Sequence, residues 1–296
     1  MNASTFPVLQ EAQWREEAAL HLAIVREVTT PIRRRKERNE RHPVMDFLFT
    51  YYSCSPGRLE RWHPGAGIIL AGARFTEGFT PRHYRQSSEG LLCDPSLLEQ
   101  KGHDRLSWTL DLLRKTQERP PHLGCHGLHE WAMVYRGHDQ HLRHRESAPL
   151  RLGQQGTDEV VRSLPLRCTH YDAYRFFTPE AAPLNHLRPQ LFTRELNEQP
   201  GCVHANMDLY KWVYKSLPWV SSRLLRETLF LAIEAREVDM RASPYELTAY
   251  GYAPIKIETL EGRRQYQEAQ FSLYRRGLTL RQKLIGELER VLALTS

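Results

Sequence analysis

Apolar residues recur every three or four positions along much of the chain, which is the pattern of amphipathic helices. The clearest stretches are residues 9–30, with Trp14, Ala18, Leu22 and Val25 on one face, and residues 104–117, with Leu106, Leu110 and Leu113 on one face. Residues 221–243 follow the same period behind a capping serine, and residues 259–294 predict one long helix that is interrupted near Gly277. The pattern predicts a mainly α fold.

The stretches between these helices break the period. Residues 47–52 are rich in aromatic side chains and predict a buried helix or strand that ends at Ser55-Pro56-Gly57. Residues 74–104 have no clean period and predict an irregular excursion, whereas residues 255–259 have a β-like pattern.

The chain of 296 residues has the composition of a globular protein, with 41% hydrophobic and 26% charged residues. We find no repeats or linkers and expect one domain with three regions: an N-terminal helix and basic strip in 1–42, an aromatic and histidine-rich core in 43–220, and C-terminal helices in 221–296. No apolar run approaches the roughly 18 residues of a membrane span, and the N-terminus lacks the pattern of a secretory signal. We therefore expect a cytoplasmic protein without a membrane partner.

The charge favours an anionic partner. The formal net charge is +6, and the basic residues are set among six Trp, thirteen Tyr and ten Phe. Basic surface attracts phosphate and aromatic faces stack on bases, so nucleic acid is a candidate partner. The basic residues are densest from Arg33 to Arg41, which form either a solvated helix face or a strip that contacts phosphates.

Histidines concentrate between residues 122 and 145, which contain six of the fourteen. In a helix that begins at or just after residue 127, His126 and His129 share a face with Glu130 beside them and would form a site for a metal or a proton relay. The spacing lacks the i, i+4 histidine pair of zinc proteases, so histidines that hydrogen-bond around a buried Trp131 are an equal alternative. A second run is interpreted as a solvated basic face or loop: His138, His141 and His144.

Three segments share one order of residue types, in which a cysteine and a histidine are followed by an acid and then by aromatic residues with one basic residue. The Cys/His pairs are Cys125/His126, Cys168/His170 and Cys202/His204; the acids are Glu130, Asp172 and Asp208; the basic residues are Arg136, Arg175 and Lys211. We expect the three segments to converge on one cleft.

Such a cleft could perform three kinds of chemistry. A carboxylate among aromatic residues is a good general base near neutral pH, because desolvation disfavours its charged form. The imidazoles, with an oxygen of Glu130 or Asp172, would suit zinc or non-haem iron; the candidate ligands are His126, His129, His170 and His204. A thiol nucleophile at Cys125 or Cys168 ranks lowest, since nothing distinguishes one of three similar pairs.

Four stretches resemble a group of bacterial proteins that commonly carry the name 3-methyladenine DNA glycosylase: GCHGLHEWAMVYR, THYDAYRFFTPEAAPLN, NMDLYKWVYKSLP and REVDMRASPYELTAYGYAPIKIET. The resemblance spans residues 42–296 and implies an enzyme that removes alkylated bases. The chain has neither the Gly-rich turn of the helix-hairpin-helix glycosylases nor the helical repeats of the HEAT-like ones, and the resemblance assigns no catalytic residue.

The leading interpretation is a helical hydrolase that cleaves the N-glycosidic bond of an alkylated or modified base without a cofactor, with Asp172 as the general base and Glu130 as the second candidate. The expected substrate-binding residues are Trp62, His63, Trp131, Tyr135, Arg136, Tyr171, Tyr174, Arg175, Asp208 and Lys211. Two alternatives stay open: a zinc or iron enzyme that acts on a small molecule through the four histidines, and a nucleic-acid-binding protein without catalytic activity.

Overall fold

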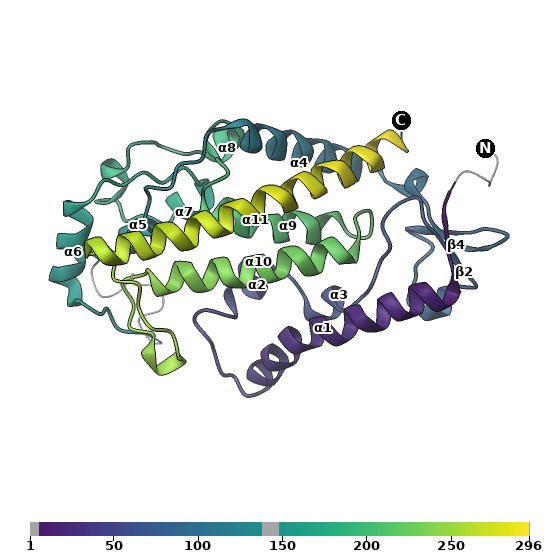
Figure 1. Cartoon of the computed structure of the whole chain (residues 1–296), viewed down its shortest axis with the longest axis horizontal. Helices are drawn as coiled ribbons and strands as arrows, with labels where there is room; N and C mark the ends of the chain where they lie inside the picture. The colour runs from purple at the N-terminus through teal and green to yellow at the C-terminus, as the bar shows by residue number, and fades with distance from the viewer. Residues whose placement is uncertain (1–5, 138–147, 296) are drawn as a thin grey trace.

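Helices predominate in the computed structural model, which describes residues 6–137 and 148–295 (Figure 1). The long helices are α1 (Glu11–Glu37), α4 (Gln100–Glu118), α6 (Gly153–Ser163), α9 (Val203–Ser216), α10 (Ser222–Arg241) and α11 (Leu260–Ala293). The short ones are α2 (Phe47–Thr50), α3 (Pro56–Leu59), α5 (Leu128–Ala132), α7 (Tyr171–Tyr174) and α8 (Arg194–Asn197). Single 3-10 turns are η2 (Phe75–Glu77), η3 (Pro95–Leu97), η4 (Ala182–Leu184), η5 (Leu191–Thr193) and η6 (Thr248–Tyr250). The predicted mainly α fold is confirmed.

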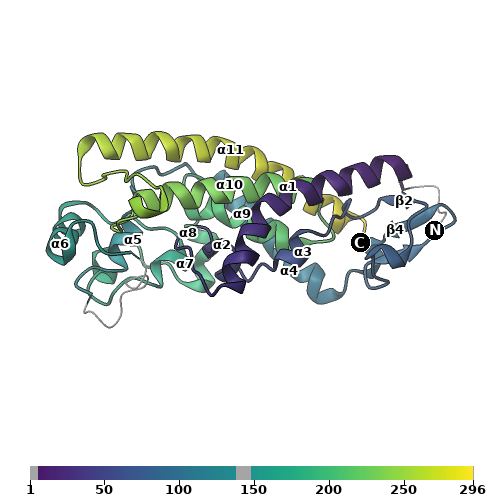
Figure 2. The same ribbon diagram turned by 90° about the horizontal axis from the view of Figure 1, so that it is seen from below.

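Helix α9 forms the centre of the molecule. Thirteen of its residues are buried, so it has almost no solvated face and needs neighbours on every side. Helices α10 and α11 pack along it, α4 packs on α11, and α1 packs on α10 (Figures 1 and 2). None of the described helices combines the length and the apolar character of a membrane span.

Helix α11 is continuous through Gly277, contrary to the predicted interruption. A Cβ atom on Gly277 would lie 2.1 Å from Oδ1 of Asn206 in α9. The glycine therefore marks the point where the two helices approach closely, and Arg281 Nη2 donates a hydrogen bond of 2.9 Å to the same Asn206 oxygen.

A small sheet lies at the end of the molecule that contains the N-terminus (Figure 1). Its strands are β1 (Val8–Leu9), β2 (Ile69–Ala71), β3 (Tyr84–Gln86) and β4 (Gly90–Cys93), in the order β1-β2-β4-β3. Strand β1 is parallel to β2, and the other pairs are antiparallel, with Ile69 opposite Leu92 and Tyr84 opposite Cys93. The β3–β4 hairpin corrects the prediction of an irregular excursion; its strands are too short to show a period of two. Conversely, the β-like residues 255–259 form no strand.

Helix α1 extends beyond the predicted residue 30 and contains Pro31 in its interior. A proline removes one backbone hydrogen bond there, and the helix continues to Glu37. Part of the basic strip thus forms the last turn of α1. There the positive charges of Arg34, Arg35 and Lys36 interact favourably with the negative end of the helix dipole. The second histidine run, residues 138–144, lies outside the described residues.

Candidate metal centre

Several short elements bring histidines and carboxylates to one face of α9. Helix α9 itself carries His204 and Asp208, which are one turn apart, and Lys211 one turn further on. The other contributors are His129 and Glu130 on α5, His170 immediately before α7, Glu198 immediately after α8, and Arg236 and Asp239 on α10. All of these side chains are buried.

His129, His204 and Asp239, which we call the His129 centre, face a common point. The Nε2 atom of His129 lies 2.6 Å from Oδ1 of Asp239, and Nε2 of His204 lies 3.9 Å from Oδ2. The two imidazole rings meet edge to face with centroids 4.5 Å apart. One ligand atom from each of the three residues lies within 4.8 Å of the others. The Cys125 thiol lies beside His129 and contributes to the raised pKa of its ring.

The His204 side chain makes no hydrogen bond with any described residue, although the exposed fraction of His204 is only 6%. Its Nδ1 is buried without a partner, and 3.9 Å is too long for a hydrogen bond from Nε2 to Asp239. Buried polar atoms in folded proteins nearly always have a partner. Burial lowers the pKa of His204 to about 3, so its ring is neutral and carries a free lone pair.

The His129 centre has a deficit of positive charge. Arg236 Nη1 lies 3.0 Å from Glu130 Oε1 and 3.1 Å from Asp239 Oδ2, so one guanidinium serves two buried carboxylates. Burial alone would raise the pKa of Asp239, but His129 and His204 lower it below its usual range. Burial likewise would lower the pKa of His129, but Asp239 raises it well above its usual range. A proton on His129 or a bound cation supplies the missing charge.

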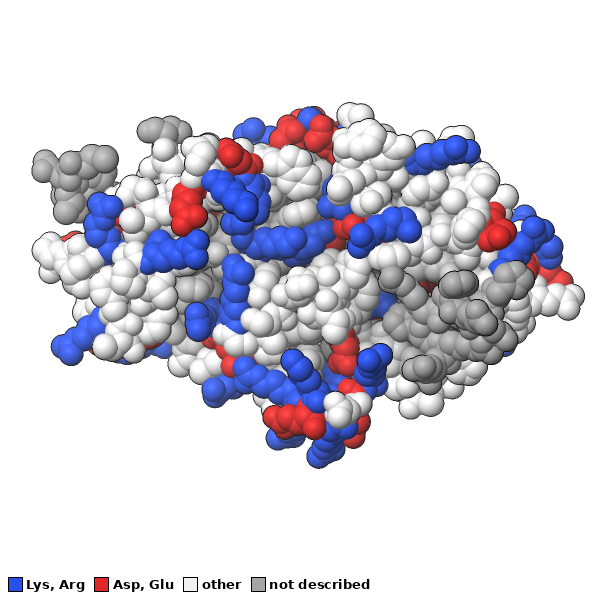
Figure 3. Space-filling view, turned by 180° about the vertical axis from the view of Figure 1, so that it is seen from behind, with Lys and Arg blue, Asp and Glu red and all other residues white. Residues whose placement is uncertain are grey.

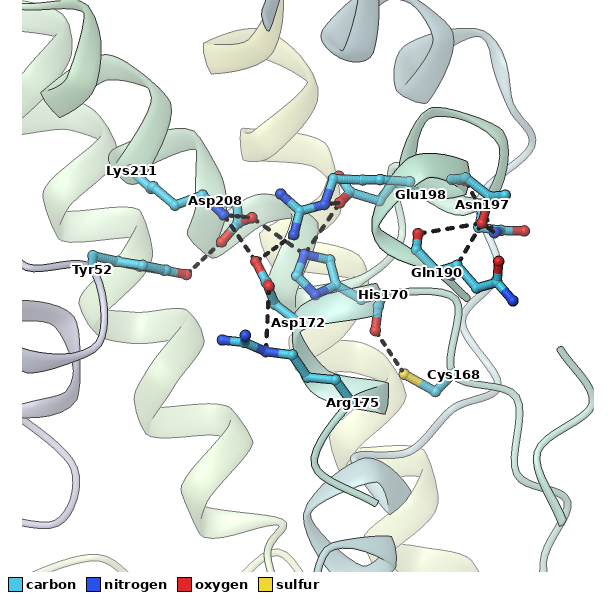
Figure 4. Close-up of polar contacts among 12 residues, drawn as sticks. Tyr52, Cys168, His170, Asp172, Arg175, Gln190, Asn197, Glu198, Asp208 and Lys211 are labelled. Carbon is cyan, nitrogen blue, oxygen red and sulfur yellow. Dashed lines mark hydrogen bonds and ion pairs between the residues drawn. The ribbon is translucent and has the colours of Figure 1, made fainter. Parts of the chain in front are cut away.

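A second group of side chains, which we call the charged cluster, consists of His170, Asp172, Glu198 and Asp208 with the basic residues Arg175, Arg194 and Lys211. Figure 4 shows the acids of this cluster around His170. The rings of His170 and His204 stack with centroids 5.3 Å apart. The His170 Nε2 atom lies 3.3 Å from Asp208 Oδ2 and 3.5 Å from Glu198 Oε1. These three residues also bring ligand atoms within 4.8 Å of one another.

Built-in cations balance the carboxylates of the charged cluster. Arg194 lies 3.1 Å from Glu198 and 2.6 Å from Asp172, and Lys211 contacts both Asp172 and Asp208. On the outer side, Arg175 Nε lies 3.6 Å from Asp172 Oδ1. Three carboxylates thus meet three permanent cations in the charged cluster, whereas Glu130 and Asp239 share the single guanidinium of Arg236.

A cavity of about 30 Å³ joins the two groups. Its polar wall contains Glu130, His204 and Arg236 from one side and His170, Asp172 and Asp208 from the other. Its aromatic and apolar wall is made by Phe47, Tyr51, Tyr52, Met133 and Phe176. This volume accommodates one or two water molecules, so any larger reactant requires part of the wall to move.

The structure brings together most of the predicted ionisable residues but not all of them. It places eight in or beside the two groups: His129, His170, His204, Glu130, Asp172, Arg175, Asp208 and Lys211. His126 instead contacts Tyr266, and the backbone of Arg136 binds Asp158. These two predictions are corrected.

The predicted stacking residues lie mostly elsewhere. Trp62 stacks on Trp14, and His63 bonds to Tyr84, beside the small sheet. The indole of Trp131 is fully buried and donates to the Ala242 carbonyl, and Tyr135 is also buried in the interior. Tyr171 lies beside Arg194 and Arg175 without lining the cavity, and Tyr174 packs on Phe177. Of the thiols predicted as possible nucleophiles, burial raises the pKa of Cys168 to about 11, and Cys125 contacts His129 and Gln270.

Asp239 and Arg236 were missed by the sequence analysis. They lie three residues apart in α10, on the same buried face as Leu229 and Ala232. Two charged residues on the apolar face of an amphipathic helix are the signal that could have identified them.

Comparison with known proteins gave no match: no protein-family model fits the chain, and no curated protein or solved structure is significantly similar to it.

Proposed function

We propose that the protein is a metal-dependent enzyme that acts on a small molecule, with one zinc or iron ion held by His129, His204 and Asp239. The observation that carries the proposal is the buried, neutral His204 ring, which has no hydrogen bond with the described residues and faces a second imidazole and a carboxylate. Two histidines and one carboxylate are the ligands of many catalytic zinc sites and of non-haem iron sites.

The surrounding residues suit this role. Ligating histidines usually bond through their second nitrogen to a neighbouring group that fixes the ring, and the Cys125 thiol lies beside His129. A bound metal would supply a Lewis acid, and its charge would replace that of the proton which the raised pKa places on His129.

Glu130 is the proposed proton carrier. It lines the cavity beside His204, and burial raises the pKa of its carboxyl although Arg236 opposes the rise. A carboxyl group with a raised pKa exchanges protons with a reactant near neutral pH. Arg236 is a positioning residue, because it holds Glu130 and Asp239 through one nitrogen atom.

We assign no second ion to the charged cluster. Its carboxylates already contact Arg194 and Lys211, and a divalent ion would have to displace at least one of these cations from a buried position. The cluster instead fixes one wall of the cavity.

Titration of the metal-free protein with Zn²⁺ and with Fe²⁺ under anaerobic conditions, by calorimetry, tests the proposal. We expect one site per chain, and an affinity at least about 100-fold weaker in His204→Ala, because one of three ligands is removed. His126→Ala is the matched control, since His126 lies outside the centre, and should bind as the wild type does. Equal affinities of the two folded variants would refute the assignment.

Cleavage of an N-glycosidic bond is the second candidate. The observation in its favour is that Asp172 lines the aromatic cavity as a carboxylate: burial raises its pKa, but Lys211 and Arg194 produce a net lowering. Such a group would stabilise positive charge on a sugar rather than act as a general base. Release of bases from alkylated DNA that survives metal removal and is lost in Asp172→Asn would favour this candidate.

A further inference from the structure

A groove of about 820 Å³ lies between the last turns of α1 and residues 46–57. It is separated from the buried cavity by the segment that contains α2. Phe49 and Ser53 face the groove, whereas Tyr51 and Tyr52 line the cavity. Figure 3 shows Lys and Arg side chains gathered with some acids over this end of α1.

Four polar side chains of the groove are unpartnered. Lys36, Asn39, Arg41 and Ser53 make no side-chain hydrogen bond or ion pair with the residues that the structure describes. Nearby acids do not account for them: Arg35 lies 2.5 Å from Asp46, and Arg33 lies 3.1 Å from Glu60. The remaining acid of the groove is Glu40. The unpaired groups of the groove thus carry a net positive charge.

The backbone at two of these positions is in the left-handed region. Asn39 has a φ of 55° and Ser53 a φ of 54°, and both line the groove. Both positions close a helix end, because the Glu40 N–H bonds to the Arg35 carbonyl and the Cys54 N–H bonds to the Phe49 carbonyl. These caps fix the backbone on both sides of the groove.

We infer that the groove binds a phosphorylated small molecule of nucleotide size. An ammonium, a guanidinium, an amide and a hydroxyl are donors that suit the oxygens of one phosphate group. Ile32, Phe49 and Pro56 supply an apolar wall for the organic part, and the volume is within the range of small-ligand sites. The four donors are exposed and line the same groove, and the volume of the groove favours a small molecule over an extended nucleic-acid strand.

The test is calorimetric titration of the full chain with AMP, and with adenosine to isolate the contribution of the phosphate. We expect AMP to bind and adenosine to bind at least about tenfold more weakly. The double variant Lys36→Gln/Arg41→Gln should lose at least about tenfold in AMP affinity.

Arg34→Gln/Arg38→Gln is the matched control, because it removes the same charge from the same basic strip outside the groove. It should stay within about twofold of the wild type, and circular dichroism confirms the fold of each variant. Equal losses in the two double variants, or no binding of AMP by the wild type, would overturn the inference. Binding of a twelve-nucleotide single strand alone, with steep salt dependence, would replace it by a nucleic-acid site.

Discussion

Arg236 determines the charge balance of the His129 centre. Its exposed fraction is 2%, it contacts Glu130 and Asp239, and its guanidinium lies 4.0 Å from the centre of the Phe47 ring. Carboxylates that are buried without a counter-ion are costly, and removal of one partner of a buried ion pair typically destabilises a fold strongly.

Replacement of Arg236 by methionine should therefore lower the free energy of unfolding by about 3–5 kcal/mol. Chemical denaturation of the metal-free protein measures this change. Arg223→Met on the same helix is the control, because Arg223 forms an exposed pair with Glu227 and should change stability by less than about 1 kcal/mol. Similar small effects of both substitutions would mean that Arg236 does not balance these carboxylates.

Some residues of the site could be predicted from the sequence because they follow a local pattern. His129, His170 and His204 precede or begin helices with an acid close by, and this order of residue types was sufficient to select them. His126 was assigned by helical spacing, but α5 begins at Leu128 and His126 itself has a φ of 46°. Helical spacing does not apply to a residue that precedes the helix. The His126 side chain therefore lies against Tyr266, outside the His129 centre.

The crossing of α9 and α11 determines how the central element is held. At Gly277 the two helices are so close that no side chain fits between them. The Asn206 amide donates a hydrogen bond to the carbonyl of Pro200, just before α9, and its oxygen accepts one from Arg281 of α11. This crossing lies on the helix that also carries His204 and Asp208.

Gly277→Ala should destabilise the protein by about 1–3 kcal/mol, because its Cβ would overlap Asn206. Gly286→Ala on the same helix has open space around its Cβ and should be neutral or stabilise by up to about 1 kcal/mol. Thermal unfolding of the two variants measures the difference. A stabilising effect at Gly277 would show that the helices are further apart.

The helices α1, α4, α10 and α11 were predicted because each shows several turns of one period. The β3–β4 hairpin was not, since strands of three and four residues give no measurable alternation. The extension of α1 through Pro31 is stabilised by the burial of Thr29 and Ile32 on either side of the proline. Intrinsic helix propensity does not include such tertiary packing, so the sequence pattern alone did not predict it.

The stability of the whole molecule should depend on pH through His63 at the sheet end. Burial, followed by the charges of His83 and Arg58, lowers the pKa of His63 to about 3. An unfolded chain has a histidine pKa of about 6.5. Between these values the unfolded state binds more protons than the folded one, so stability falls as the pH falls from about 6.5 towards 3.

His63→Gln should make this decline shallower, by at most about 1.4 kcal/mol per pH unit. Denaturation curves recorded between pH 7 and pH 4 measure the slope. The control is His186→Gln at an exposed position, which should leave the slope unchanged. An unchanged slope in His63→Gln would contradict a neutral, partly buried His63.

At the scale of the whole molecule, we propose that one metal ion binds at the buried junction of α5, α9 and α10. Elemental analysis of protein purified without a histidine tag or added metal is the decisive measurement. We expect about one zinc or iron ion per chain. Two ions per chain would contradict the neutral charged cluster, and a folded protein with none would contradict the metal centre itself.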